Sequence, residues 1–262
     1  MDSIQGKLIP SMCEIQANRQ ESLIQSKLYR EGLVPVCRVM PGKAEWSRIP
    51  LKCFNTGEND KNIKFSFRYT FPEGAERVYF AYTFPWSLND NNKFLDKLIA
   101  KNAHREDIYI KREVATLSFE GRPMDMLTIT GSNGKLEERE ELIPGLFPNS
   151  DPLKRPLKFA QKKYIWVSSR VHPGEIAASH MLNGFLGMLL SDPSRDVRVK
   201  LALHHFVFVI VPMLNPDGVY RGHYRTDTHG NNLNRCYLNP DPKTMPTIYA
   251  ADKIIESTLL SN

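Results

Sequence analysis

The stretch at residues 164–175, YIWVSSRVHPGE, constrains the fold more than any other part of the chain. Its apolar residues at 164–167 predict a buried strand, and the Pro-Gly pair that follows forces a sharp turn. The turn places His172 and Glu175 three positions apart at the carboxyl end of a strand, where open α/β sheets bind their ligands. An imidazole nitrogen and a carboxylate oxygen at this spacing suit zinc. The plainer alternative is a histidine in an ordinary strand-to-helix turn.

A second polar segment follows a predicted apolar strand at 206–212. Residues 215–241 read NPDGVYRGHYRTDTHGNNLNRCYLNPD, and the NPDG turn lies beside the His172 turn if the two strands are neighbours. Guanidinium groups bind carboxylates bidentately, so this segment favours carboxylate recognition next to a metal. The alternative is a polar surface loop whose arginines pair with Asp217 and Asp227. The polar side chains concerned are Arg221, Arg225, Arg235, Asn231, Asn232 and Asn234.

The hydrophobic periodicity divides the chain near residue 83. Alternating apolar residues at 62–71 and 77–85 predict an antiparallel strand pair across the turn at 72–74. Beyond the boundary, strands alternate with helices, which predicts a mixed α/β sheet. We therefore expect an α/β protein with an incomplete, antiparallel β-sandwich-like domain at 1–82 and an α/β domain at 83–262. Within these domains we expect helices at 87–103, 178–190 and 248–260, and a helix or an irregular excursion at 20–32. We expect strands at 6–10, 34–39, 108–121, 123–132 and 163–170, and a solvated loop with one helical turn at 135–158.

Composition excludes several classes of protein. Charged residues make up 24% of the chain and hydrophobic residues 41%, which is typical of a globular protein. No apolar run is long enough to span a membrane, and the first ten residues lack the apolar core of a secretory signal. The four cysteines are widely spaced, which favours reduced thiols in the cytoplasm. The net charge of +6 is spread along the chain, and no nucleic-acid-binding motif is present, so we expect no nucleic-acid partner.

Taken together, the motifs resemble the zinc carboxypeptidase family. HPGE, NPDG, GHYR and NLNR occur in that family's order and spacing, and the longer runs SSRVHPGE, PMLNPDGV, RGHYRTD and NLNRCYL are similar to its cytosolic carboxypeptidases, the tubulin deglutamylase branch. Upstream, QSKLYREG and RVYFAYTFPWS resemble that branch's N-terminal β-sandwich and its junction with the catalytic domain. The resemblance covers residues 22–260, and it implies that 83–262 is the first half of a mixed-sheet zinc carboxypeptidase domain.

The resemblance also implies roles for single residues. His172 and Glu175 would be two of three zinc ligands, and Arg225 would polarise the scissile carbonyl. Asn234 and Arg235 would hold the free α-carboxylate of the C-terminal residue. In many zinc carboxypeptidases an aspartate orients the zinc-bound histidine from the position of Asn232. We therefore predict that the Asn232 side-chain carbonyl accepts the imidazole N–H, which makes the imidazole less basic than an aspartate would.

The resemblance implies that the protein would remove C-terminal or branch-point glutamates from polyglutamylated tubulin and similar acidic tails. It would be a cytoplasmic enzyme, with microtubule association and nuclear entry left open. The family's third zinc ligand and general base lie further downstream, so we expect a chain truncated at both ends, weak zinc binding, negligible hydrolysis and an exposed apolar strand edge. The alternative is a non-catalytic module that binds acidic C-terminal peptides through Arg225, Asn234 and Arg235.

Overall fold

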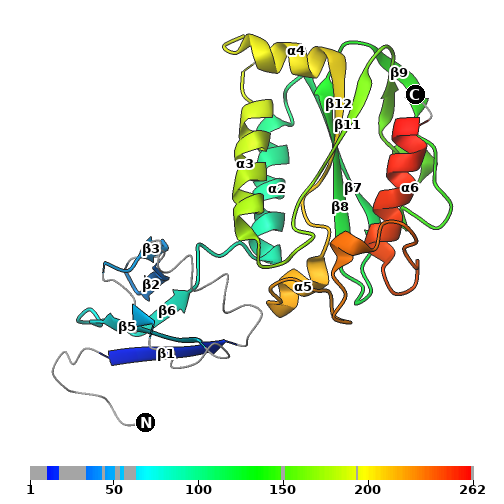
Figure 1. Cartoon of the computed structure of the whole chain (residues 1–262). Helices are drawn as coiled ribbons and strands as arrows, with labels where there is room; N and C mark the ends of the chain where they lie inside the picture. The colour runs from blue at the N-terminus through cyan, green and yellow to red at the C-terminus, as the bar shows by residue number, and fades with distance from the viewer. Residues whose placement is uncertain are drawn as a thin grey trace. The chain divides into compact units, whose positions relative to one another are not determined.

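The computed structural model describes residues 11–17, 34–42, 45–50, 54–55, 63–148, 151–192 and 194–260. The predicted strand at 6–10 and helix at 20–32 lie outside these residues. The chain forms two compact units, Met1–Pro85 and Trp86–Asn262 (Figure 1). Among the described residues, no helix combines the length and apolar character needed to cross a membrane.

The described residues of the first unit form two antiparallel three-stranded sheets. One has the order β1 (Ser11–Ala17), β5 (Ile63–Tyr69), β4 (Phe54–Asn55), and the other β3 (Ser47–Arg48), β2 (Val36–Met40), β6 (Arg77–Ala81). The ring of Phe80 on β6 lies 5.1 Å from that of Phe67 and 4.9 Å from that of Tyr69, both on β5. The aromatic side chains of the two sheets therefore share one core, as their alternation predicted.

The predicted pairing of 62–71 with 77–85 is wrong. β5 pairs with β1 and β4, whereas β6 pairs with β2, in register from Val36 opposite Ala81 to Met40 opposite Arg77. The turn at 72–76 moves the chain from one sheet to the other instead of closing a hairpin. Period-two alternation shows which face of a strand is buried, and it does not show which strand lies alongside.

The second unit is a mixed four-stranded sheet with the order β11 (Lys163–Ser168), β12 (Phe206–Val211), β8 (Pro123–Gly131), β7 (Ile108–Leu117). α2 (Leu88–Asn102) and α3 (Ile176–Leu189) cover one face, and α6 (Pro246–Leu260) covers the other (Figure 1). Leu95, Leu186 and Ile210 are fully buried on the first face, whereas Ala250 and Val211 are fully buried on the second. The mixed α/β architecture is as predicted.

The predicted boundaries hold for several elements of this unit. Ser87 caps α2, its Oγ accepting the Asp90 N–H at 3.1 Å while Asp90 Oδ2 accepts the Ser87 N–H at 3.0 Å. β7 and β8 pair antiparallel around a turn in which Gly121 has a φ of +79°. The chain then continues through α4 (Val197–His205), β12, α5 (Pro216–Arg221) and the 3₁₀ turn η2 (Leu233–Arg235).

Two predictions for this unit need correction. The side chains at 164–167 are half-buried rather than buried, because β11 forms an edge of the sheet in the described part of the chain. The segment 135–158 contains the expected helical turn, η1 (Pro152–Lys154), but it is more than a solvated loop, because β9 (Lys135–Arg139) pairs with β10 (Leu157–Phe159). All five residues of β9 are exposed, so it carries no hydrophobic alternation to reveal it.

Candidate metal and carboxylate site

The register of β11 against β12 brings the two motif turns together. These strands are parallel, with Ser168 opposite Val211, so both strands end at the same edge of the sheet. Backbone hydrogen bonds extend the pairing beyond the strands: Ser169 N donates to Val211 O at 3.0 Å, and Leu214 N donates to Ser169 O at 2.9 Å. The HPGE and NPDG turns therefore lie side by side at the carboxyl end of the sheet, where ligand sites of open α/β sheets occur.

Two glycines allow the turns and the following loop to approach closely. A Cβ atom on Gly218 would lie 2.4 Å from Pro173 Cγ, and one on Gly174 would lie 2.5 Å from Tyr224 Cδ2. The Gly174 N–H also donates to Tyr224 O at 2.7 Å. HPGE, NPDG and GHYR are therefore in direct contact, with backbone packed where a larger residue would not fit.

Arg170 holds the HPGE turn from inside. Its side chain is buried, and its Nη2 and Nε donate to Pro173 O at 2.7 and 3.1 Å, while Nη1 donates to Ser179 Oγ at 2.9 Å and to Trp86 O at 3.1 Å. Burial lowers the pKa of Arg170 to about 10. Arg170 lies inside the SSRVHPGE motif, but the sequence did not show that its side chain holds the backbone of the turn in place.

His172 lies between an amide and a carboxylate. Its Nε2 is 2.9 Å from Asn232 Oδ1, the contact expected from the sequence, and its Nδ1 is 2.9 Å from Glu175 Oε1. Asn232 Oδ1 also accepts the Asn234 N–H at 3.2 Å, which assigns the oxygen end of this amide. When the imidazole is neutral, Nε2 therefore carries its proton and Nδ1 presents a lone pair.

The donor chemistry of this pair fits zinc. With a neutral imidazole, Nδ1 and Glu175 Oε1 are both acceptors, and two acceptors at 2.9 Å need a proton or a cation between them. Histidine nitrogen and carboxylate oxygen are zinc donors, and a partner on the second imidazole nitrogen is the usual support for a metal-bound histidine. Across the residues that the structure describes, no group of three or more His, Cys, Asp or Glu side chains forms a candidate metal site.

Arg225 contacts this pair directly, whereas the carboxylate-binding candidates lie further along the loop. Arg225 Nη1 is 3.5 Å from Glu175 Oε1, and both side chains are about half exposed. Asn234 and Arg235 are exposed on η2, one turn after Asn232, and Arg235 Nη1 donates to Asn234 O at 3.0 Å. No contact joins Arg235 to His172 or Glu175 among the described residues.

The surface-loop alternative is wrong about the aspartates. Asp217 is buried and pairs with Arg122, at 2.7 Å, and not with an arginine of its own loop. Asp227 is also buried and accepts the backbone N–H groups of Asn231 and His229 at 2.7 and 2.9 Å. Asp227 therefore fixes the conformation of the loop that places Asn232 next to His172. The sequence alone did not reveal this role, because it depends on the loop conformation.

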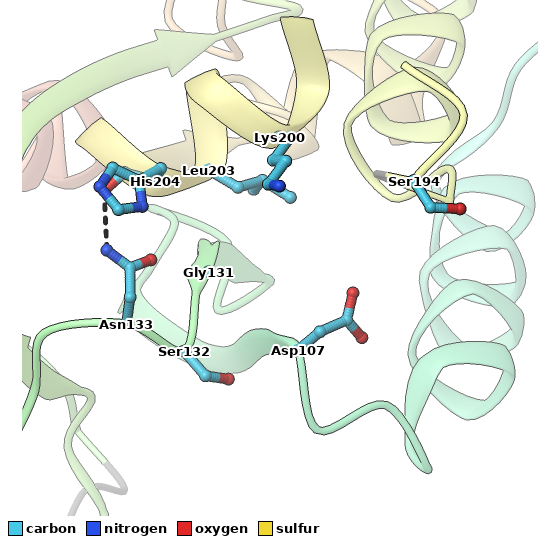
Figure 2. A pocket seen from close by; sticks show the side chains of 8 residues that line it. All are labelled: Asp107, Gly131, Ser132, Asn133, Ser194, Lys200, Leu203 and His204. Carbon is cyan, nitrogen blue, oxygen red and sulfur yellow. Dashed lines mark hydrogen bonds between the residues drawn. The ribbon is translucent and has the colours of Figure 1, made fainter. Parts of the chain in front are cut away.

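A separate cavity of about 410 Å³ lies at the opposite end of the sheet. It is lined by residues from the end of β8, from α4 and from the segment before β7, including Gly131, His204 and Asp107 (Figure 2). None of its lining residues belongs to the four motifs. The candidate site is therefore the contact of the motif turns rather than this cavity.

Comparison with known proteins agrees with these motifs. The zinc carboxypeptidase family model matches residues 94–248. Human cytosolic carboxypeptidase-like protein 5 is 40% identical over 240 residues, which cover 88% of this chain and 27% of that protein. Mouse cytosolic carboxypeptidase 6 is 32% identical over 231 residues, covering 87% and 37%. The chain thus spans about a quarter to two fifths of the length of these relatives.

Solved structures show the same fold. A metallo-carboxypeptidase from Burkholderia cenocepacia superposes with a TM-score of 0.65 at 24% identity, over 95% of this chain and 56% of that one. One from Pseudomonas aeruginosa gives a TM-score of 0.63 at 21% identity, over 96% and 55%. With the family model covering more than half of its residues, the chain belongs to the zinc carboxypeptidase family, and the relatives that it resembles are cytosolic carboxypeptidases.

Proposed function

We propose that this chain forms the zinc- and carboxylate-binding part of a metallocarboxypeptidase that removes C-terminal glutamates from acidic protein tails, such as those of polyglutamylated tubulin. The observation that carries the proposal is that Arg225 and Asn232 both converge on the pair formed by His172 and Glu175. The imidazole Nδ1 and the carboxylate form a donor pair, Arg225 reaches the same carboxylate oxygen, and Asn232 holds the far side of the imidazole.

His172 and Glu175 would hold the metal in this proposal. Zinc, when bound, supplies a Lewis acid and an activated water. Asn232 keeps the imidazole proton on Nε2 and so leaves Nδ1 free to act as a ligand. The buried Arg170 keeps the turn that carries both ligands in place through its two hydrogen bonds to Pro173 O.

Arg225 is suited to stabilise the developing charge on the substrate. Its side chain is 44% exposed and its Nη1 is 3.5 Å from Glu175 Oε1, so it lies next to the metal donors and remains accessible to a peptide carbonyl. A fixed positive charge at the position where an oxyanion develops is usually the largest single catalytic contribution.

Arg235 and Asn234 would select the chain end. Arg235 is exposed and forms no ion pair with an acidic group in the described part of the protein. Its guanidinium is therefore available to bind a carboxylate through two N–H donors. A free α-carboxylate distinguishes a chain terminus from an internal peptide bond, which makes the activity that of an exopeptidase. The acidic substrate class rests on the similarity to cytosolic carboxypeptidases and agrees with the net charge of +6. The relatives' name also supports a cytoplasmic location.

A second candidate is a non-catalytic module that binds acidic C-terminal peptides. The observation that favours it is that the peptide-binding part of the site is more complete than the metal-binding part. The described residues include all three groups proposed to contact the peptide, but they bring only two metal donors together.

One binding experiment tests both candidates. The affinity for a glutamate-rich peptide with a free C-terminal carboxylate is compared with that for its C-terminal amide, with zinc and with a chelator, and glutamate release is followed in parallel. We expect the acid to bind more tightly, and Arg235→Ala to remove the difference. Arg195→Ala, which changes an arginine with an 86% exposed side chain in the α3–α4 connection, is the matched control. Chelator-sensitive glutamate release by a protein that contains this chain supports the enzyme, and chelator-insensitive binding without release supports the module. Equal affinity for acid and amide would refute both.

A further inference from the structure

The turn between β7 and β8, residues 118–122, is fixed to the start of α5 and is called the brace below. Asp217, in the first turn of α5, is 5% exposed and accepts three hydrogen bonds from the brace. The donors are Ser118 Oγ at 2.6 Å, Glu120 N at 3.0 Å and Arg122 Nη1 at 2.7 Å. A buried carboxylate is stable when it is paired and hydrogen-bonded in this way, so the contact has a defined geometry.

The brace also holds the end of α5. Arg122 pairs with Glu120, and Glu120 Oε1 accepts from Arg221 Nε at 2.5 Å. The guanidinium of Arg122 lies 3.8 Å above the ring centre of Tyr220. Both the first and the last turn of α5 are therefore anchored to the same five-residue turn. GHYR, with Arg225, begins immediately after this helix.

A second contact lies on the other side of Arg225 in the chain. The ring of Phe119, at the tip of the brace, packs edge-on against the ring of His229, with 4.2 Å between the centroids. His229 belongs to the short loop closed by Asp227, and that loop leads directly to Asn232 and η2. The brace thus contacts the segment before Arg225 and the segment after it.

We propose that the brace positions Arg225 and the Asn232–Arg235 turn relative to His172, so that Arg122 and Phe119 are positioning residues for carboxylate recognition. This inference rests on the proposed function and adds to it a determinant outside the four motifs. Arginines on a loop recognise a carboxylate selectively only when the loop is held in place, and a displacement of about 1 Å can cost on the order of a hundredfold in activity.

The hairpin offers a matched control for Arg122. Arg112, on β7, forms a comparable ion pair with Asp125 at 2.8 Å, and its side chain is 22% exposed, against 20% for Arg122. Arg112→Met and Arg122→Met therefore remove similar half-buried ion pairs from the same hairpin, and only the second removes a contact with α5. Phe119→Ala is the second test variant, because its side chain is 51% exposed and its loss leaves the core intact.

The measurement is the ratio of affinities for a glutamate-terminated peptide and its C-terminal amide, by calorimetry on the full chain, together with urea unfolding. We expect Arg122→Met to lower the acid-over-amide ratio about tenfold, and Phe119→Ala to lower it in the same direction. We expect Arg112→Met to leave the ratio within about twofold while it destabilises the fold to a similar degree. If Arg122→Met does not fold, Phe119→Ala decides the question.

The outcomes separate the two proposals. A high ratio in the wild-type protein that persists in folded Arg122→Met or in Phe119→Ala overturns the role of the brace and leaves the proposed function standing. A ratio that falls equally in Arg112→Met also overturns it, because the effect would then be one of general stability. A ratio near one in the wild-type protein refutes the proposed function, and the role of the brace fails with it.

Discussion

Gly174→Ala tests whether the close approach of the motif turns is needed for binding. The added Cβ would lie 2.5 Å from Tyr224 Cδ2 and 2.8 Å from Tyr224 O, and that same carbonyl accepts the Gly174 N–H at 2.7 Å. The overlap cannot be relieved by a side-chain rotation alone, because a backbone atom is involved. The HPGE and GHYR segments must separate, and the hydrogen bond between them must lengthen or break.

The cost follows from these contacts. Overpacking and the loss of one hydrogen bond together destabilise the fold by about 3 kcal/mol, which corresponds to a decrease in Tm of roughly 6–12 °C for a domain of this size. Because Tyr224 precedes Arg225, a shift of about 1 Å there should weaken carboxylate-dependent peptide binding by about 10- to 100-fold.

Gly184→Ala is the matched control for this substitution. Gly184 lies within α3, and a Cβ there would meet no atom within 4 Å. Alanine in a helix interior is favoured over glycine by about 1 kcal/mol, so this variant should be slightly more stable and bind normally. Urea unfolding and calorimetric titration with the glutamate-terminated peptide measure both effects. Wild-type stability and affinity in Gly174→Ala would refute the reasoning.

Three further predictions concern pH, the support of His172 and the isolated chain. Burial lowers the pKa of Lys162 to about 8, against about 10.4 in the unfolded chain. Because the unfolded chain binds more protons between these values, the free energy of unfolding should rise from pH 8 to about 10.4, and the rise should be absent from urea titrations of Lys162→Met. Asn232→Ala removes the acceptor of the His172 Nε2 proton, and chelator competition on the full-length protein should show zinc affinity reduced about 10- to 100-fold; unchanged affinity would exclude the supporting role. The isolated 262-residue chain should bind zinc weakly and release glutamate at a negligible rate, because its described residues bring two zinc donors together and a hydrolytic site needs three. Robust chelator-sensitive release would contradict this last prediction.

Motif order and local chemistry made much of the candidate site accessible from the sequence. A Pro-Gly turn after an apolar run places His172 at a strand end in any fold that buries the run, and the contact with Asn232 was expected from family resemblance and is present. The start of α2 was equally local, because the side chains of Ser87 and Asp90 each accept the backbone N–H of the other. Such features depend on residues a few positions apart in the sequence, or on several motifs that together indicate the family.

Partner choice was decided only by the tertiary structure. Strands β5 and β6 lie in different sheets, and Phe67 and Tyr69 on β5 pack across the sheets against Phe80 on β6. Asp217 could pair with any nearby arginine, and only the folded hairpin shows that Arg122 is the partner. The sequence by itself therefore determined which residues are candidates for the chemistry and where several elements begin. The choice among chemically equivalent partners far apart in the chain depends on geometry that exists only after folding, so the brace could be seen only in the structure.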